Sequence, residues 1–129
     1  MDTIEVAHTL RVLVVDDNED AADSLAMMLE LMGFETASAH NGTQALLVAL
    51  NFLPNVVFLD LGMPGMSGFD VARELRIVPG LESVVIAALT AWGDPTIRAR
   101  TKASGFNAHL QKPAQMDELV QVCTNAAHR

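Results

Sequence analysis

Short apolar runs alternate with segments of helical periodicity along the chain. Runs rich in Val, Leu and Ile predict buried strands at 10–15, 55–59 and 84–89, and weaker runs predict strands at 35–40 and 108–111. Between the runs, apolar residues recur at helical spacing. This periodicity predicts helices at 19–32, 42–53, 69–78 and 95–104, and a final helix that begins near residue 116.

The helical periodicity also predicts which residues face the core. We expect the 95–104 helix, which carries three basic residues, to have the poorest apolar face. The other expected faces are Leu25, Met28, Leu29 and Met32 in the first helix, Leu46, Ala49, Leu50 and Leu53 in the second, and Met116, Leu119, Val120 and Cys123 in the last.

Five strands that alternate with five helices predict a doubly wound α/β fold, in which helices cover both faces of a parallel sheet. Periodicity does not give the order of the strands. In such folds, functional groups gather beyond the carboxyl ends of the strands. The residues at or just after the predicted strand ends are Asp16, Asp17, Asp60, Thr90 and Lys112.

Composition, net charge and the lack of long apolar runs exclude several classes of function. A chain of 129 residues, half of them hydrophobic and 19% charged, is expected to form one globular domain. The net charge of −8 argues against direct nucleic-acid binding. The sequence has no apolar run long enough for a membrane span, no basic leader, and a single cysteine, which excludes an internal disulfide. We therefore expect a cytoplasmic protein.

Three carboxylates at one edge favour a divalent cation, because clustered carboxylates repel one another unless a cation lies among them. Hard oxygen ligands suit Mg²⁺. Asp60 stands alone after its strand and is the candidate nucleophile towards a phosphoryl group. The adjacent Asp16 and Asp17 are the candidate metal ligands, with the Lys112 ammonium opposite them.

Each of these residues also has an ordinary structural interpretation. Asp16 and Asp17 stand where acids favour a helix N-terminus, and Asp60 precedes a turn-rich loop. Thr90 fits the end of a strand, whereas Lys112 lies in a segment that otherwise reads as core and is the least ordinary of the set. Cys123 lies on an apolar helix face and is interpreted as a core thiol.

Four motifs resemble those of the receiver domain of two-component response regulators. They are Val14–Asn18, the run Leu59–Gly68, Leu89–Ala91 and Gln111–Pro113, and the resemblance extends from about Leu10 into the last helix. It implies a flavodoxin-like (βα)5 fold with sheet order 2-1-3-4-5. We expect residues 1–9 to be an N-terminal tail and residues 10–129 to be the receiver domain.

Residue by residue, the resemblance makes Asp60 the acceptor of phosphate from a histidine kinase or a histidine phosphotransfer protein. Asp16, Asp17, Asp60 and the backbone carbonyl of Gly62 would hold Mg²⁺, for which Mn²⁺ could substitute. Lys112 and Thr90 would contact the phosphoryl group, and the Lys112–Pro113 peptide bond would be cis.

The chain also departs from the family pattern. His109 stands where the family often has Tyr or Phe. Gly62, Ala91 and Trp92 occupy positions that we expect to modulate access of water to the phosphoryl group. The 95–104 helix, with the last strand and helix, is the expected output surface for a downstream protein target.

The resemblance predicts a phosphorylation-operated regulator that assists its own phosphorylation and dephosphorylation and is not an enzyme acting on a separate substrate. One alternative is a receiver excised from a hybrid histidine kinase, and another is a receiver that serves only as a binding module. A flavodoxin-like FMN carrier is the alternative from another class, although the acidic loop after the first strand would repel a flavin phosphate.

Overall fold

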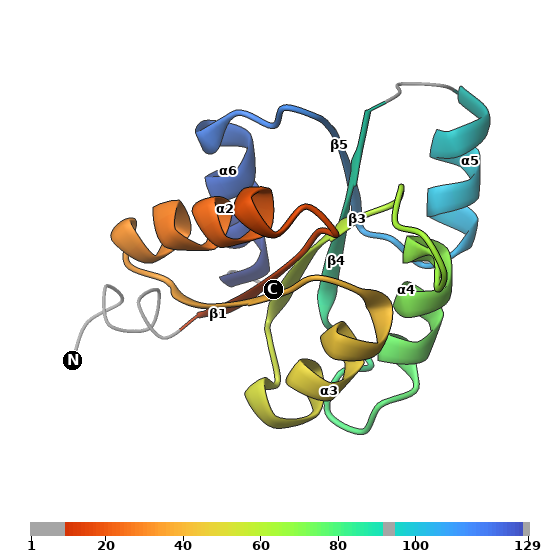
Figure 1. Cartoon of the computed structure of the whole chain (residues 1–129), viewed down its shortest axis with the longest axis horizontal. Helices are drawn as coiled ribbons and strands as arrows, with labels where there is room; N and C mark the ends of the chain where they lie inside the picture. Colours follow the sequence, from red (N-terminus) through yellow and green to blue (C-terminus); the bar gives the residue numbers. More distant parts are fainter. Residues whose placement is uncertain (1–9, 92–94, 128–129) are drawn as a thin grey trace.

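The computed structural model describes residues 10–91 and 95–127, which contain five strands and five helices in strict alternation (Figure 1). The strands are β1 Arg11–Val15, β2 Glu35–Ala39, β3 Val56–Asp60, β4 Val85–Thr90 and β5 Ala108–Gln111. The helices are α2 Glu19–Leu31, α3 Gly42–Phe52, α4 Gly68–Arg76, α5 Pro95–Ala103 and α6 Met116–Ala127. Every predicted element is present, with its bounds displaced by at most a few residues.

The five strands form one parallel sheet of order β2-β1-β3-β4-β5, so the order implied by the resemblance is confirmed. The central strand β3 is fully buried along its length. Its register aligns Leu59 with Val15 of β1 and Asp60 with Leu89 of β4. Because all strands run in the same direction, their carboxyl ends meet at one edge of the sheet.

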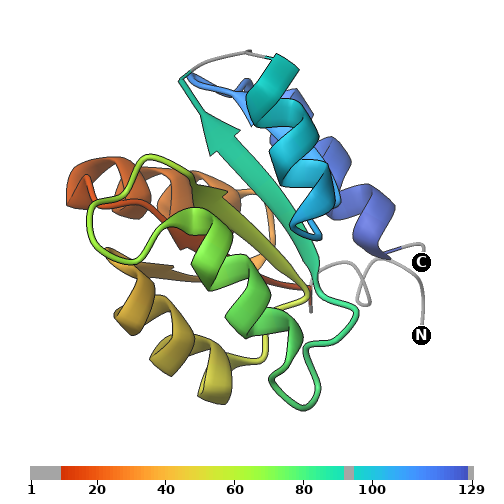
Figure 2. The ribbon, with the colours of Figure 1, turned by 90° about the vertical axis from the view of Figure 1, so that its right-hand side faces the viewer.

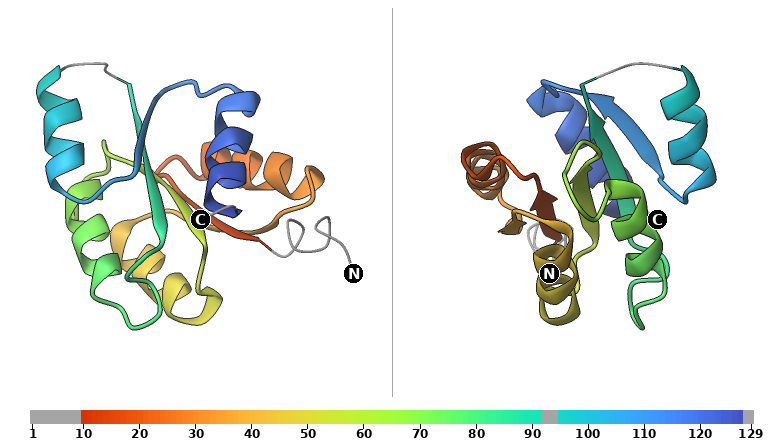
Figure 3. Two further views of the ribbon diagram at one scale, coloured as in Figure 1. Left: turned by 180° about the vertical axis from the view of Figure 1, so that it is seen from behind. Right: turned by 45° about the vertical axis from the view of Figure 1, so that its right-hand side comes forward.

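Helices cover both faces of the sheet (Figures 2 and 3). An apolar layer on each face holds them against it. On one face, α2 and α6 cover Val12, Val14 and Phe58, which are fully buried. On the other face, α3 and α4 cover Val57 and Leu59. The alternation of side chains along each strand therefore supplies both layers, as expected for a sheet covered on both sides.

The predicted core faces of α2 and α3 were partly wrong. In α2 the buried residues are Ala22, Ala26 and Leu29, while Met28 and Met32 are about half exposed. In α3 the buried residues are Gly42, Ala45 and Ala49, while Leu46 is partly buried and Leu50 and Leu53 are exposed. Both helices turn small residues towards the sheet, which allows a close approach. The predicted Leu29 is buried with them in α2, while other large apolar side chains stay outside.

The last helix agrees better with its prediction, since Leu119 and Cys123 are both buried. The α5 helix buries only Thr101, in accord with its predicted poor apolar face. A guanidinium holds α5 near α4, because Arg100 Cζ lies 4.0 Å from the ring centroid of Phe69. Within the described residues, no helix is long and apolar enough to cross a membrane.

Candidate functional site

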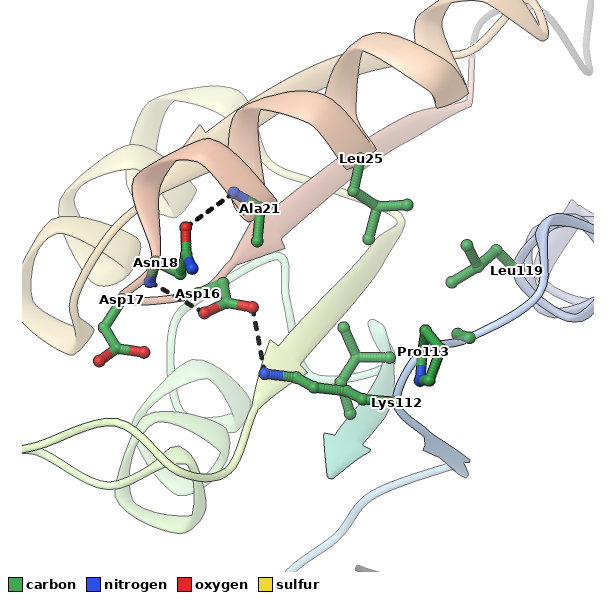
Figure 4. Close-up of a pocket in the computed structure, with 10 residues that line it drawn as sticks. Asp16, Asp17, Asn18, Ala21, Leu25, Lys112, Pro113 and Leu119 are labelled. Atoms are coloured by element: carbon green, nitrogen blue, oxygen red, sulfur yellow. Dashed lines mark hydrogen bonds and ion pairs between the residues drawn. The ribbon is translucent and has the colours of Figure 1, made fainter. Parts of the chain in front are cut away.

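Asp16 lies directly after β1 and is only 6% exposed. Its backbone N–H donates to the carbonyl of Ala39 at the end of β2, which fixes its position at the sheet edge. Oδ1 accepts from the N–H of Asn18 at 3.0 Å, and Oδ2 lies 3.2 Å from Lys112 Nζ (Figure 4). The N-cap of α2 is Asn18, whose side chain accepts from Ala21 N–H, so Asp16 does not serve as that cap.

Asp60 is the last residue of β3 and is 5% exposed. Its Oδ1 accepts a hydrogen bond from the N–H of Gly62 at 3.0 Å, which is the local turn that the ordinary interpretation expects. The same oxygen lies 3.1 Å from Lys112 Nζ. Asp60 is therefore a buried carboxylate in a long-range ion pair, and its role extends beyond the turn.

Gly68, at the start of α4, permits the close return of the chain beside Asp60. A Cβ at this position would lie 2.8 Å from the backbone carbonyl oxygen of Asp60 and 3.0 Å from Leu61 Cα. These contacts involve backbone atoms that have little room to move. Sequence reasoning missed this positioning role and named Gly68 only as the end of the Leu59–Gly68 motif.

Lys112 follows β5 and joins the two buried carboxylates. Its N–H donates to the carbonyl of Thr90 at 2.7 Å, and the Lys112–Pro113 peptide bond is cis. Burial alone would lower the pKa of Lys112, but hydrogen bonds and charges from Asp60 and Asp16 outweigh it and raise the pKa above 10.5. The ammonium is consequently charged at neutral pH.

Asp16, Asp17 and Asp60 each place a carboxylate oxygen within 4.8 Å of the others. Asp16 and Asp60 are buried, and Asp17 is exposed at the rim. Lys112 is the ammonium that pairs with two of the three carboxylates, so the cluster keeps an excess of two negative charges. An all-oxygen donor set with this excess fits a hard divalent cation such as Mg²⁺.

Other predicted site residues lie around this cluster. Thr90 ends β4, is 5% exposed and aligns with Gln111 of β5. Ala91 is exposed. His109 on β5 faces α5, with Nδ1 3.3 Å from Thr101 Oγ1. Trp92, predicted as a modulator, lies outside the described residues.

A cavity of about 610 Å³ opens beside the carboxylates, between α2 and the segment that follows β5 (Figure 4). Asp16, Asp17 and Lys112 form its polar end. Its apolar lining is Ala21, Leu25, Leu89, Pro113, Ala114 and Leu119. Sequence reasoning did not predict this cavity, because its walls come from three separate parts of the chain.

A family model described as the response regulator receiver domain matches residues 12–124. The chain belongs to this family. Among curated relatives, the DNA-binding response regulator MtrA of Mycobacterium tuberculosis is 40% identical over 110 residues, which cover 85% of this chain and 47% of MtrA. Sporulation initiation phosphotransferase F of Bacillus subtilis is 29% identical over 109 residues, which cover 84% of this chain and 86% of that protein.

Solved structures agree with the sequence relatives. Chemotaxis protein CheY4 of Vibrio cholerae has a TM-score of 0.86 at 27% identity, covering 92% of this chain and 98% of that chain. A putative response regulator from Chloroflexus aurantiacus has a TM-score of 0.85 at 30% identity, covering 94% and 99%. The chain spans about half the length of MtrA. The receiver domain is thus a signalling module with a flavodoxin-like fold, as the sequence predicted.

Proposed function

We propose that this receiver domain is a phosphorylation-operated switch whose phosphate acceptor is Asp60. One observation carries the proposal: Lys112 Nζ lies 3.1 Å from Asp60 and 3.2 Å from Asp16. This ammonium places a positive charge beside the Asp60 carboxylate, where the transferred phosphoryl group would be attached. The phosphate donor is a histidine kinase or a histidine phosphotransfer protein, and the output is a contact with a downstream protein.

The reaction is a transfer between two nucleophiles. A carboxylate oxygen of Asp60 attacks phosphorus, the P–O bond of an acyl phosphate forms, and the P–N bond of the donor phosphohistidine breaks. The imidazole leaves with the electron pair and takes a proton from water. Oδ1 of Asp60 already accepts from Gly62 and contacts Lys112, so we assign the attack to Oδ2.

Asp16, Asp17 and Asp60 would hold Mg²⁺, together with the backbone carbonyl of Gly62. The bound ion would neutralise charge that develops on the phosphoryl oxygens. Lys112 contributes a second positive charge from its position beside Asp16 and Asp60. Water later attacks phosphorus and restores the carboxylate, so the domain assists its own dephosphorylation and acts on no separate substrate.

Thr90 and α5 are the elements that respond to phosphorylation. Thr90 lies at the end of β4, and its carbonyl accepts from Lys112 N–H, so a contact with the phosphoryl group would be felt by both strand ends. The α5 helix buries only one residue. Moving it should therefore cost less free energy than moving any of the other helices. Its exposed Arg98 and Lys102 would present the changed surface to a downstream protein.

The donor protein would approach over the cavity beside the carboxylates. This cavity places Leu25, Pro113 and Leu119 next to Asp16 and Lys112. An apolar surface on the donor would bury the accessible parts of Leu25 and Pro113 while its phosphohistidine reaches the polar end. We further propose that residues 10–129 form this receiver and that residues 1–9 are its tail. The protein would work in the cytoplasm, without contacts to a membrane or to nucleic acid.

The test uses the whole chain, Mg²⁺ and a small acyl phosphate as donor, followed by intact mass spectrometry. The wild type and the Asp70→Asn variant should both gain the mass of one phosphoryl group, whereas Asp60→Asn should gain none. Asp70 is the matched control because it is an acid of the following helix that pairs with Arg73. Equal labelling of Asp60→Asn and the wild type would overturn the proposal.

A further inference from the structure

The α3 helix differs in charge from every other helix in the described ranges 10–91 and 95–127. It contains no Asp, Glu, Lys or Arg, whereas α2, α4, α5 and α6 all carry charged side chains. The charge-free stretch extends in the sequence from residue 36 to residue 59. A surface helix in a chain of net charge −8 would ordinarily carry charges on its solvent face.

Large apolar side chains take the place of those charges. Leu47 is 59% exposed, Leu50 is 53% exposed, and Leu53 at the C-cap is 40% exposed. Leu47 and Leu50 lie on one face of the helix, because residues three apart are neighbours on a helix surface. Thr43, four residues before Leu47, extends the same strip and is also exposed. We call Thr43, Leu47 and Leu50 the α3 strip.

The helix that carries the α3 strip is held by side-chain hydrogen bonds at both ends. Asn41 caps its N-terminus by accepting from Gln44 N–H at 2.8 Å. At the other end, the Arg11 guanidinium donates to the carbonyls of Phe52 and Leu53. A surface held in this way loses little conformational freedom when it docks against another surface.

We infer that the α3 strip pairs with the same strip of a second copy of this chain, in a symmetric dimer with antiparallel helices. In a two-fold contact, residue i touches residue j and j touches i. With Leu47 nearest the axis, Leu47 would face the partner's Leu47, and Leu50 would face the partner's Thr43. The polar Thr43 and the apolar Leu50 would thus alternate along a self-complementary strip.

Charge selects a second copy as the occupant. Two molecules of net charge −8 repel each other, and the cost is lowest where the contact contains no charged side chain. A basic partner would instead be drawn to the acidic surfaces. An anionic membrane surface would need lysines or arginines beside the leucines, and α3 has none.

A second group of exposed apolar side chains, on α2, has charged residues beside it. Met27, Met28 and Leu31 are exposed there, but Glu30 lies among them and Glu35 follows closely in the chain. Pairing two copies through α2 would bring these like charges together. The α2 group therefore serves as the internal control for an apolar surface that should not self-associate.

The pairing should be weak, because one helix offers less area than the roughly 1,200 Å² buried in the smaller stable interfaces. We expect a dissociation constant between about 1 μM and 1 mM. The inference does not rest on the proposed phosphorylation. It predicts the same dimer for Asp60→Asn, so failure of one proposal leaves the other standing.

Sedimentation equilibrium of the whole chain tests the inference over this concentration range. The wild type and Leu31→Glu should dimerise, whereas Leu47→Glu and Leu47→Lys should each remain monomeric. An equimolar mixture of the two Leu47 variants should dimerise again, because opposite charges then meet at the axis. This rescue also shows that both variants are folded.

Four results would overturn the inference. The first is a wild type that is monomeric throughout, and the second is a dimer that Leu47→Glu leaves intact. The third is a mixture of the Leu47 variants that stays monomeric, which would mean that Leu47 does not face its own copy. Loss of the dimer in Leu31→Glu would place the contact on α2 and would equally contradict the inference.

Discussion

Lys112 Nζ lies 3.1 Å from Asp60 Oδ1 and so connects the segment after β5 to the end of β3. Lys112 follows the edge strand β5, and Asp60 ends the central strand β3, yet the same ammonium also reaches Asp16 after β1. The ion pair joins the carboxylate that we propose as phosphate acceptor to the strand that borders α5. We therefore expect a change in charge at Asp60 to act on Lys112, which follows β5.

Replacing Lys112 with Met should lower the free energy of unfolding in metal-free buffer by about 1–2 kcal/mol, because Asp16 and Asp60 would stay buried without a counter-charge. Added Mg²⁺ should recover part of the loss by supplying positive charge. Urea denaturation with and without Mg²⁺ measures both effects. Lys102→Met, at an exposed lysine of α5, is the control. Equal stability of Lys112→Met and the wild type without Mg²⁺ would contradict the electrostatic role.

Replacing Asp17 with Asn should have the opposite effect in metal-free buffer. It removes one carboxylate from a cluster with an excess of two negative charges, so the free energy of unfolding should rise by about 0.5–1 kcal/mol. The same variant should lose most of the stabilisation that Mg²⁺ gives the wild type, since that stabilisation follows binding affinity. Thermal unfolding at increasing Mg²⁺ measures both. Undiminished stabilisation by Mg²⁺ would remove Asp17 from the ligand set.

Asp23 on α2 stabilises the fold by an amount that depends on pH. Hydrogen bonds from His40 at 2.9 Å and Ser38 at 2.7 Å lower the pKa of Asp23 below 3.8. A carboxyl whose folded pKa is depressed stabilises the fold above its unfolded pKa, and this contribution disappears as pH falls through the folded pKa. Asp23→Asn should therefore be less stable than the wild type at neutral pH.

The difference between Asp23→Asn and the wild type should shrink as pH falls below 3.8. Urea midpoints measured across this range give the comparison. Glu30→Gln, at an exposed acid of the same helix, should show no such convergence. A constant difference at all pH values would mean that the Asp23–His40 contact does not stabilise the charged carboxylate.

Cys123 should be chemically inert while the domain is folded. Burial raises the pKa of its thiol to about 12, and the side chain is fully buried in the α6 layer. Because the thiolate is the reactive form, labelling by a disulfide reagent at pH about 8 should be slow in buffer and fast in urea. Rapid labelling of the native protein would contradict the burial of α6 against the sheet.

The sequence predicted the sheet well, because a buried strand is visible in the sequence as a continuous run of apolar residues. β3 and β4 are buried at every position, and their apolar runs admit no helical reading of similar quality. The strand order needed the family resemblance, since periodicity carries no information on neighbours. The acids at the strand ends were found for the same reason, as each follows an apolar run.

Helix orientation was harder to predict. The periodicity of α2 offered large apolar residues on two sides, and the sheet selected the side with Ala22 and Ala26 because small side chains allow close packing. The bridging contact of Lys112 was also beyond the sequence, which placed it at the right edge but gave no distances. The Asn18 cap could have been found, since Asn immediately before Glu19 and a helical run is a recognised N-cap signal.

The most direct test of the account is to locate the phosphoryl group on the protein. After reaction with a small acyl phosphate and Mg²⁺, borohydride reduces an aspartyl phosphate to homoserine, and peptide mass spectrometry then identifies the modified position. We expect a single modified residue, Asp60, and a loss of labelling when Mg²⁺ is chelated. Modification at Asp16 or Asp17, or labelling that is unaffected by chelation, would contradict it.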